Sequence, residues 1–498
     1  MNDTTEQTAL HAGAPADPKT APCISLVVIA ALIVMAAGFW LRVSHMDDPV
    51  RNDEAFTYLM YVKRADYFNY SMPNNHILNT LLVSASAQMA GGAPWTLRLP
   101  DFLFGLALIP AVGLLCFQLC GSRSLSIAAM ALAASSTALV EYSTNARGYS
   151  LIACMAAVMA CVTVRLGKSP KWRTGWVVWT CCGVAGLYSV PTMLLAILPL
   201  TLLLLADRWA EVKQRLLPLS LSLLSTAVIT VLLYEPVIAT SGLAAITANP
   251  YVSPETLGTI PAEMSTRLGE LAAMWGASAP AFFLPFLCLG TCLCAVAAAM
   301  RGSNRALLLS LLAIAVAIAM AFLQRRVAPA RVYLYLQPWM IGCACAAIAL
   351  LLNRFTRRAK SLQLAVAILL LLLAADNWIK VKRQPLLISE DPHTFVEARQ
   401  VAAELVARET PWPNIAMLWD SSENIWPPLL YYYIQLRPAG RSLASWDDRQ
   451  CNAAFILLSP GDNLDAFLKR KPGFSQLYAP PQLIRETANS RVYLAEHR

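Results

Sequence analysis

Charged residues are scarce in this chain. Asp, Glu, Lys and Arg make up only 14% of its 498 residues, against roughly 25% in an average soluble domain. Apolar residues make up 57% of the chain, and they gather in runs of about 18 residues or more, the length that crosses a bilayer. This composition excludes an ordinary soluble globular protein and indicates a polytopic membrane protein.

Metal-binding and disulfide patterns are also missing. The five histidines show no ligand spacing, so no metal site is predicted. Twelve of the thirteen cysteines lie in or beside apolar runs, and only Cys451 lies in a clearly aqueous segment, so no disulfide framework is implied. These residues indicate no cofactor, and they neither require nor exclude a divalent metal.

The N-terminal tail, residues 1–23, lacks the basic region and the small-residue cleavage site of a signal peptide. The first apolar run is therefore expected to stay in the protein, with the tail on the cytoplasmic side. The net charge of +9 does not indicate a nucleic-acid partner. Most basic residues lie in short loops between apolar runs, where they set topology.

Eleven apolar runs are expected to cross the membrane as helices, which predicts an all-α transmembrane domain over residues 24–378. The runs are 24–41, 99–119, 125–141, 149–164, 174–188, 191–205, 216–238, 279–300, 306–323, 332–352 and 361–378.

The charges of the connecting loops give the orientation. With the N-terminus inside, the inner loops total 37 residues and carry 14 Lys or Arg, whereas the outer segments total 115 residues and carry 9. This asymmetry is the positive-inside rule. We therefore expect an integral protein of a bacterial inner membrane, with the long loops facing the periplasm.

Residues 75–89 form a shorter apolar segment that Asn79 and Gln88 interrupt. A length of about 15 residues suits an interfacial helix better than a span. Counting the segment as a span would put the basic loops outside, so residues 56–97 are expected to form juxtamembrane helices on the outer surface. The second long outer loop, 239–278, contains an amphipathic run and is expected to close over a lipid-facing cavity.

Residues 379–498 differ in character, because charge rises and long apolar runs stop. A helix is expected over 393–408, with its apolar face formed by Phe395, Ala398, Ala402 and Leu405. Short strands are expected at 415–419, 454–458 and 492–495, which predicts a small α/β domain. An odd number of spans places this domain outside the cytoplasm, although the basic residues at its start oppose that side: Lys380, Lys382 and Arg383.

An adjacent acidic pair, Asp53 and Glu54, follows the first span. Carboxylates so close to a bilayer are costly unless they serve a polar role, and a carboxylate beside a hydroxyl can act as a general base. The alternative is a solvated first turn of a helix, where acidic residues are favoured. Five further charges lie at the outer mouths of spans and suggest a polar cavity that opens outward: Asp101, Glu141, Arg147, Glu235 and Asp376.

The outer loop 324–331 carries Arg325, Arg326 and Arg331, against the positive-inside trend. Arginine presents a planar fork of donors that suits phosphate oxygens. These side chains are therefore candidates to bind a lipid phosphate. Pairing with acidic residues of the neighbouring outer domain is the alternative.

Two other polar candidates for substrate binding also have structural interpretations. His76, which follows Asn75, is a lone histidine, and such residues are more often hydrogen-bonded structural residues than ligands. Arg147 lies at an outer mouth with Glu141 one loop away, so ion pairing and substrate binding are both open for it.

Four short motifs occur in a fixed order over residues 24–200. They are Asp53-Glu54, Asn75-His76-Ile77-Leu78, Arg98-Leu99-Pro100 and Ala146-Arg147-Gly148-Tyr149. This ordered set resembles the C-type (GT-C) glycosyltransferases, close to the protein O-mannosyltransferase and aminoarabinose transferase group. The double proline that follows the histidine in that family is missing after His76.

The resemblance implies an inverting transfer of a sugar from a polyprenyl-phosphate carrier to an acceptor, without settling the sugar. It implies that Asp53 is the catalytic base. The residues it implies for substrate binding are Glu54, Asn75, His76, Arg98, Arg147, Tyr149, Arg325, Arg326 and Arg331. The expected partners are the lipid-linked donor, membrane lipid and a glycan, lipid or protein acceptor.

Two other functions compete with transfer. A transporter or flippase of lipid-linked sugars would be expected to show inverted repeats and broken helices at mid-membrane, and the sequence shows neither. A non-catalytic membrane scaffold would have an outer cavity without donor-dependent chemistry. The sequence favours the glycosyltransferase.

Overall fold

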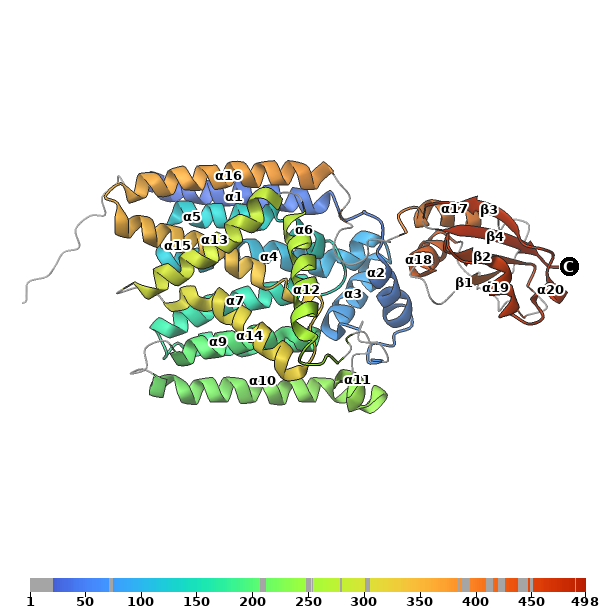
Figure 1. Ribbon diagram of the computed structural model, residues 1–498, viewed down its shortest axis with the longest axis horizontal. Helices are drawn as coiled ribbons and strands as arrows, with labels where there is room; N and C mark the ends of the chain where they lie inside the picture. Colours follow the sequence, from blue (N-terminus) through green and yellow to red (C-terminus); the bar gives the residue numbers. More distant parts are fainter. Residues whose placement is uncertain are drawn as a thin grey trace, which may run out of the picture.

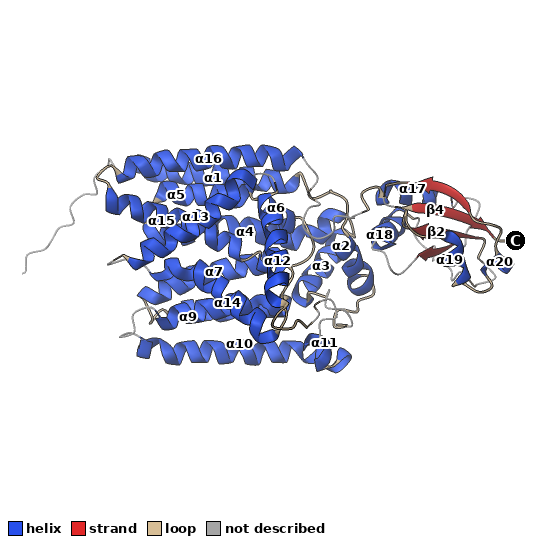
Figure 2. Ribbon diagram, in the orientation of Figure 1, coloured by secondary structure: helices blue, strands red, loops and turns tan. Residues whose placement is uncertain are grey.

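The computed structural model of the protein describes residues 21–70, 75–206, 212–247, 252, 254–277, 280–300, 305–383, 386, 395–408, 415–419, 426–437, 447, 451–488 and 490–498. The chain forms a helical bundle, and a small domain with a β-sheet projects from one end of it (Figures 1 and 2). The predicted fold class is confirmed. Most of the N-terminal tail lies outside the described residues.

Among these residues, eight helices are long and apolar enough to cross a membrane. They are α1 Ala21–Val43, α4 Pro94–Cys120, α7 Tyr149–Lys168, α10 Val212–Ser241, α13 Pro280–Ala299, α14 Leu309–Gln324, α15 Leu336–Phe355 and α16 Ala359–Arg383. Short 3-10 turns, η5 Arg305–Leu308 and η6 Ala330–Tyr333, precede α14 and α15. Helix α16 runs past the domain boundary expected at residue 379.

The three other predicted spans are also helical, but they are shorter or broken. Helix α8, Arg173–Ser189, has 17 residues, and α9, Leu194–Ala206, follows the 3-10 turn η3, Pro191–Met193. The run 125–141 is split into α5, Arg123–Ser135, and α6, Thr137–Ser143, which meet at 59°. By length and composition alone, eight helices of the described residues qualify as spans, or nine with the bent pair, and α8 and α9 are the two shorter helices of the eleven predicted runs.

Side chains from other helices form hydrogen bonds with polar groups at the bend between α5 and α6. Ser136 has extended backbone, so carbonyls of the last turn of α5 lose their helical partners. Arg42 Nη1 donates to the Ala134 carbonyl over 3.0 Å, and Asn377 Nδ2 donates to the Ser135 carbonyl over 2.5 Å. Ser136 Oγ donates to Gln337 Oε1 over 3.0 Å. The break turns α6 away from the axis of α5.

The segment after α1 stays at one end of the bundle (Figure 1). It contains α2, Asn52–Thr57, the π-helical turn η2, Tyr58–Val62, and α3, Ile77–Ala90. With 14 residues, α3 is too short to cross a hydrocarbon core of about 30 Å. The second long loop forms α11, Leu243–Thr247, and α12, Ile260–Gly276.

The C-terminal domain contains a four-stranded sheet in the order β1-β2-β4-β3. The strands are β1 Ile415–Trp419, β2 Ala453–Leu458, β3 Gln482–Glu486 and β4 Arg491–Glu496, and the helices are α17 Ala398–Arg408, α18 Trp426–Leu436, α19 Leu464–Lys469 and α20 Phe474–Leu477. β1 and β2 are parallel, and the other pairs are antiparallel.

The three predicted strands of this domain are confirmed, and so is the buried face of α17. The helix was predicted to start too early, because it begins at Ala398 after a turn at 396–397; residues 393–394 lie outside the described residues. β3 was not predicted, because its side chains are mostly half-buried or exposed and include Arg485 and Glu486. A bulge between Leu483 and Arg485 also interrupts its alternation.

Candidate functional site

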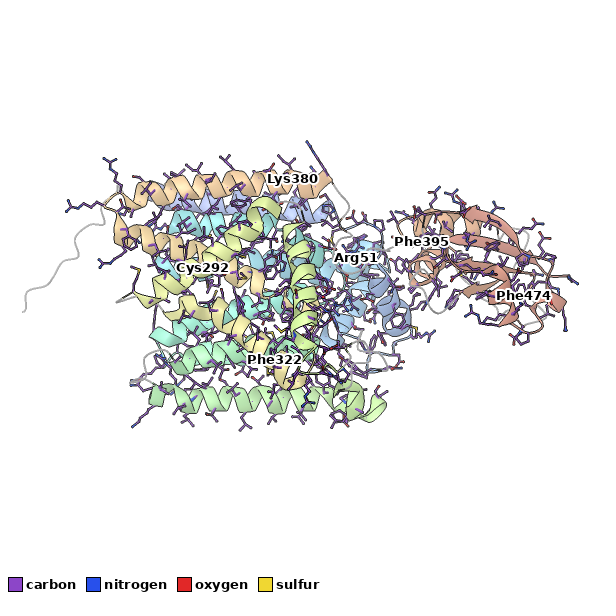
Figure 3. All side chains as sticks on the ribbon, in the orientation of Figure 1. Arg51, Cys292, Phe322, Lys380, Phe395 and Phe474 are labelled. Atoms are coloured by element: carbon purple, nitrogen blue, oxygen red, sulfur yellow. The ribbon has the colours of Figure 1, made fainter. Side chains whose placement is uncertain are left out.

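The acidic pair lies in the first turn of α2, at the end of the bundle that faces the C-terminal domain. Arg51, which immediately precedes α2, marks this place in Figure 3. The two carboxylates have different surroundings. Glu54 is 1% exposed, whereas Asp53 is 25% exposed.

Glu54 forms a two-pronged ion pair with Arg98 of α4. Arg98 Nε donates to Glu54 Oε1 over 2.9 Å, and Arg98 Nη2 donates to Oε2 over 2.7 Å. The backbone N–H groups of Ala146 and Arg51 donate to the same carboxylate, each over 2.9 Å. Burial alone would raise the pKa of Glu54, but Arg98 and Arg51 outweigh it and hold that pKa below its usual value.

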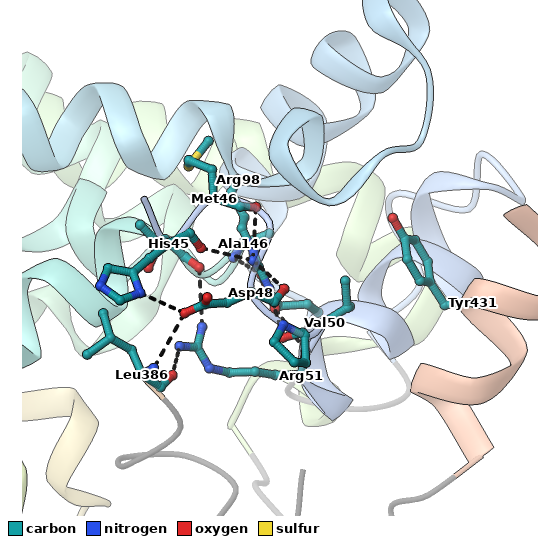
Figure 4. Close-up of polar contacts among 12 residues, drawn as sticks. His45, Met46, Asp48, Val50, Arg51, Arg98, Ala146, Leu386 and Tyr431 are labelled. Carbon is teal, nitrogen blue, oxygen red and sulfur yellow. Dashed lines mark hydrogen bonds and ion pairs between the residues drawn. The ribbon is translucent and has the colours of Figure 1, made fainter. Parts of the chain in front are cut away.

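Arg98 also holds the linker between α1 and α2 (Figure 4). Its guanidinium donates to four linker carbonyls, at 3.3 Å from His45, 3.0 Å from Met46, 2.8 Å from Asp48 and 3.1 Å from Pro49. Arg98 is 0% exposed, so its guanidinium is a buried charge, and these carbonyls and Glu54 serve as its hydrogen-bond acceptors. We call Glu54, Arg98 and linker residues 45–50 the frame.

Arg51 joins the frame to two other helices. Its Nη1 donates to the Thr144 carbonyl, which follows α6, over 3.3 Å, and its Nη2 lies 3.6 Å from Glu141. Nη2 also donates to the carbonyl of Leu386, beyond the end of α16 (Figure 4). Because of the bend after α5, α6 delivers Glu141 and Thr144 to Arg51.

Asp53 faces Arg147, whose Nη2 lies 3.0 Å from Asp53 Oδ2. Arg147 is 2% exposed. It belongs to the turn at 145–148 that joins α6 to α7. Neighbouring carboxylates thus bind different arginines, and Asp53 is the more accessible of the two.

The 145–148 turn requires a glycine. Gly148 has φ 70°, and a Cβ there would lie 2.9 Å from Asn79 Cβ and 2.8 Å from Ser189 Oγ. Its N–H donates to Asp101 Oδ2 of α4 over 3.0 Å. The turn that presents Arg147 is therefore tightly packed against Asn79, Ser189 and Asp101.

His76 contacts the other side of the same turn. Its Nδ1–H donates to the Arg147 carbonyl, since a carbonyl can only accept, and its ring meets Tyr149 edge-on at 5.1 Å between centroids. Burial and then the charge of Arg147 lower the pKa of His76 to about 3. His76 is thus a neutral hydrogen-bonding residue at ordinary pH.

Of the three loop arginines, Arg331 reaches this group. Its Nε donates to the Tyr149 hydroxyl over 3.1 Å. Arg325 is exposed and caps α14 in the left-handed conformation, and its carbonyl accepts from the Glu255 N–H over 2.7 Å. Arg326 is half-buried. Asp53, Arg147, His76, Tyr149 and Arg331 therefore form one contiguous edge, which we call the open edge.

Asn75 belongs to the support of this edge. Its Nδ2 donates to the carbonyls of Tyr67 over 2.8 Å and Asn69 over 2.9 Å, and its Oδ1 accepts from Thr80. Asn75 is 0% exposed. These bonds fix the loop before α3, so the geometry gives Asn75 a structural contact in the loop that leads to His76.

An apolar cavity of about 330 Å³ lies between α12, α13, α14 and α15. Val327 and Tyr333, which flank Arg331 in sequence, line it together with Leu268, Trp275 and Leu287. Arg267 of α12 also lines the cavity and pairs with Glu263 at 2.7 Å and Glu270 at 2.9 Å. Within the described residues, no three His, Cys, Asp or Glu side chains are grouped to hold a metal ion.

The structure brings together some, but not all, of the side chains that the sequence singled out. Of the five charges expected at the outer mouths, Asp101, Glu141 and Arg147 join the site. Glu235 and Asp376 are exposed, and Asp376 pairs with Lys380 at 2.5 Å. Arg51 was missed, although its place two residues before the acidic pair was a signal for it.

Comparison with solved structures supports the architecture. The chain is similar to ArnT from Cupriavidus metallidurans in the apo state, with a TM-score of 0.61 and 13% identity over 96% of this chain and 98% of that one. ArnT bound to undecaprenyl phosphate gives 0.59 and 13% over 95% and 98%. The Archaeoglobus fulgidus oligosaccharyltransferase complex with Zn and sulfate gives 0.54 and 12% over 93% and 72%.

No family model matches the chain, and no curated protein matches it in sequence. The structural likeness extends over nearly the whole chain, the C-terminal domain included. The chain therefore has the fold of the C-type glycosyltransferases, as its four ordered motifs predicted.

Proposed function

We propose that the protein is an inverting glycosyltransferase that moves a sugar from a polyprenyl-phosphate carrier to an acceptor hydroxyl or phosphate. The observation that carries the proposal is the open edge itself. An accessible carboxylate, Asp53, lies in one polar group with Arg147 and Arg331, and Val327 and Tyr333, which flank Arg331 in sequence, line an apolar cavity. One edge thus offers a base, cations for a phosphate and an apolar surface for a lipid tail.

Asp53 is the proposed general base for a hydroxyl acceptor. The acceptor oxygen attacks the anomeric carbon of the sugar while Asp53 takes the hydroxyl proton. The bond from that carbon to the carrier phosphate breaks, and the phosphate leaves with the electron pair. Arg147, 3.0 Å from Asp53, favours the ionised carboxylate that this step requires.

The leaving phosphate gains negative charge as the bond breaks, so fixed cations nearby lower the barrier. Arg331 is the best placed of the three loop arginines, because Tyr149 holds its side chain against the edge. Arg147 is the second candidate. Arg326 and Arg325 lie in the same loop and are the remaining candidates for the phosphate.

The apolar cavity between α12 and α15 is the proposed seat of the carrier's first isoprene units. Its lining is almost wholly apolar, and it adjoins the loop that carries Arg331. The ArnT structure solved with undecaprenyl phosphate has the same fold, which supports a polyprenyl carrier for this chain. Helix α12, from the second long loop, covers one side of the cavity.

The proposed site lies on the periplasmic face of a bacterial inner membrane. The open edge, the frame and the C-terminal domain share one end of the bundle (Figure 1), and the described basic loops 120–124, 165–173 and 353–360 join the opposite helix ends. The donor is therefore expected in the outer leaflet, and the acceptor is a glycan, lipid or protein reached from the periplasm.

Release of free carrier tests the proposal. The purified full-length protein is incubated with a panel of polyprenyl-phosphate sugars and candidate acceptors, with and without EDTA to test for a divalent metal. Acceptor-dependent release of polyprenyl phosphate with inversion at the anomeric carbon supports the function. Movement of the lipid-linked sugar across vesicles without release would instead support a flippase.

A further inference from the structure

The C-terminal domain contacts the catalytic segment directly, through one face of α18. Trp426 meets Phe56 of α2 with ring centroids 6.1 Å apart, and Tyr431 meets Tyr58 of η2 edge-on at 5.3 Å. At the far end of α18, Gln435 Nε2 donates to the Tyr58 hydroxyl over 3.0 Å. Helix α18 therefore lies along the segment that begins with the acidic pair.

Tyr432 binds the linker that enters α2. Its hydroxyl accepts from the Val50 N–H over 3.0 Å, in a buried contact. Val50 is 1% exposed, so its N–H needs this partner inside the protein. Arg98 accepts no hydrogen bond and can bind only the carbonyls of the linker. The linker is thus held by both domains: Arg98 of the membrane domain binds its carbonyls, and Tyr432 of the C-terminal domain binds the Val50 N–H.

Tyr431 binds the segment that leads into α4. Its hydroxyl donates to the carbonyl of Gly92, which lies two residues before α4, the helix that carries Arg98. The ring of Tyr431 stands next to the frame in Figure 4. A Cβ on Gly92 would lie 2.9 Å from Tyr58 Cζ, so glycine permits this close approach. Adjacent tyrosines of α18 therefore hold the segments that supply both partners of the Glu54–Arg98 pair.

We propose that Tyr432, assisted by Tyr431, is a positioning residue for the transfer reaction, and that the C-terminal domain completes the frame that aims Asp53. This inference rests on the proposed function. Tyr432 acts through Val50 and the start of α2 and does not touch the reacting atoms. A purely structural role for α18 would stabilise the domain contact without a selective effect on the chemical step.

The test compares Tyr432→Phe with Tyr433→Phe in the full-length protein. Tyr432→Phe keeps the ring and removes only the hydroxyl that binds Val50. Tyr433 lies on the same helix, is 0% exposed and has the Arg437 guanidinium 5.2 Å from its ring centroid, so Tyr433→Phe also removes a tyrosine hydroxyl from α18 but keeps the hydrogen bond between Tyr432 and Val50. For both variants, kcat of transfer and Kd of the donor are measured separately.

We expect kcat to fall about tenfold in Tyr432→Phe, because small misplacements of a catalytic group slow the chemical step, while Kd of the donor stays as in the wild type. Tyr433→Phe is expected to keep the wild-type kcat. Equal kcat values for the two variants, or a Kd that weakens in step with kcat, would overturn the positioning role.

Hydrogen exchange gives a readout that does not depend on activity. Peptides covering 46–57 should exchange faster in Tyr432→Phe than in the wild type, and unchanged in Tyr433→Phe. Unaltered exchange in Tyr432→Phe would show that the hydroxyl does not hold the linker and would refute the inference. A wild-type protein that releases no carrier with any donor would count against the proposed function, while the exchange result would still report on the contact.

Discussion

The frame around Glu54 and the open edge around Asp53 lie side by side, yet they are built differently. Glu54 and Arg98 are buried and form eight hydrogen bonds with the backbone and each other. Asp53 is partly exposed and belongs to a chain of polar contacts that ends at Arg331, whose sequence neighbours Val327 and Tyr333 line an apolar cavity. Redundant buried bonds suit a fixed support, whereas an accessible carboxylate suits contact with a substrate.

Breaking the frame should have the largest effect. Glu54→Gln leaves the Arg98 charge buried without its carboxylate, which typically costs about 3–5 kcal/mol. We expect loss of both thermal stability and transfer activity, measured by unfolding in detergent and by carrier release. A double-mutant cycle with Arg98→Met should show strong coupling. Simple additivity of the two losses would contradict a shared ion pair.

Removing the charge at the open edge should separate activity from stability. Asp53→Asn should lower the rate of transfer by about 10³, within the range for a lost general base, and change the melting temperature little. Asp376→Asn serves as the matched control, since Asp376 is an exposed carboxylate paired with Lys380. Turnover of Asp53→Asn near that of the control would refute the assignment of Asp53.

The loop arginines should differ from one another. Arg331→Met should weaken donor binding by about tenfold, as expected for one charge-assisted contact to a phosphate. Arg325→Met should have a smaller effect, because Arg325 is exposed at the end of α14. Titration of each variant with a polyprenyl-phosphate sugar measures the difference. A larger loss for Arg325→Met would move the phosphate site away from Tyr149.

The smallest effect concerns acid stability. The pKa of His76 is about 3 in the folded protein and near 6.5 when unfolded, so the unfolded chain binds the extra proton between these values. Stability that is present above pH 6.5 should therefore decline as the pH falls towards 3. His76→Gln should show a flatter decline in melting temperature over this range. An identical pH dependence in variant and wild type would contradict a buried, neutral histidine.

The sequence predicted the membrane helices well, because long apolar runs are a local signal. It did not predict the break after Ser135, because the partners that satisfy it lie far away in the chain, at Arg42, Gln337 and Asn377. The same reason explains the missed strand β3, whose polar side chains conceal its pairing with β4.

The site shows the same limit. The loop charges placed Asp53, Arg147 and Arg331 on one side of the membrane, and the structure groups them at one end of the bundle. The difference between Asp53 and Glu54 is set by the approach of Arg98 from α4. Two adjacent carboxylates have the same residue chemistry, and only the position of a distant arginine in the fold decides which of them is buried.

The bend between α5 and α6 has a consequence for how the protein is made. The Ser135 carbonyl receives its hydrogen bond from Asn377, 242 residues later, and Ser136 binds Gln337, 201 residues later. During co-translational insertion, the end of α5 therefore lacks these two hydrogen bonds until α15 and α16 enter the bilayer. The hydrogen bonds of the bend are complete only when α16 has arrived, so a chain that stalls before Asn377 lacks them even though every residue of the open edge up to Arg331 has already been synthesised.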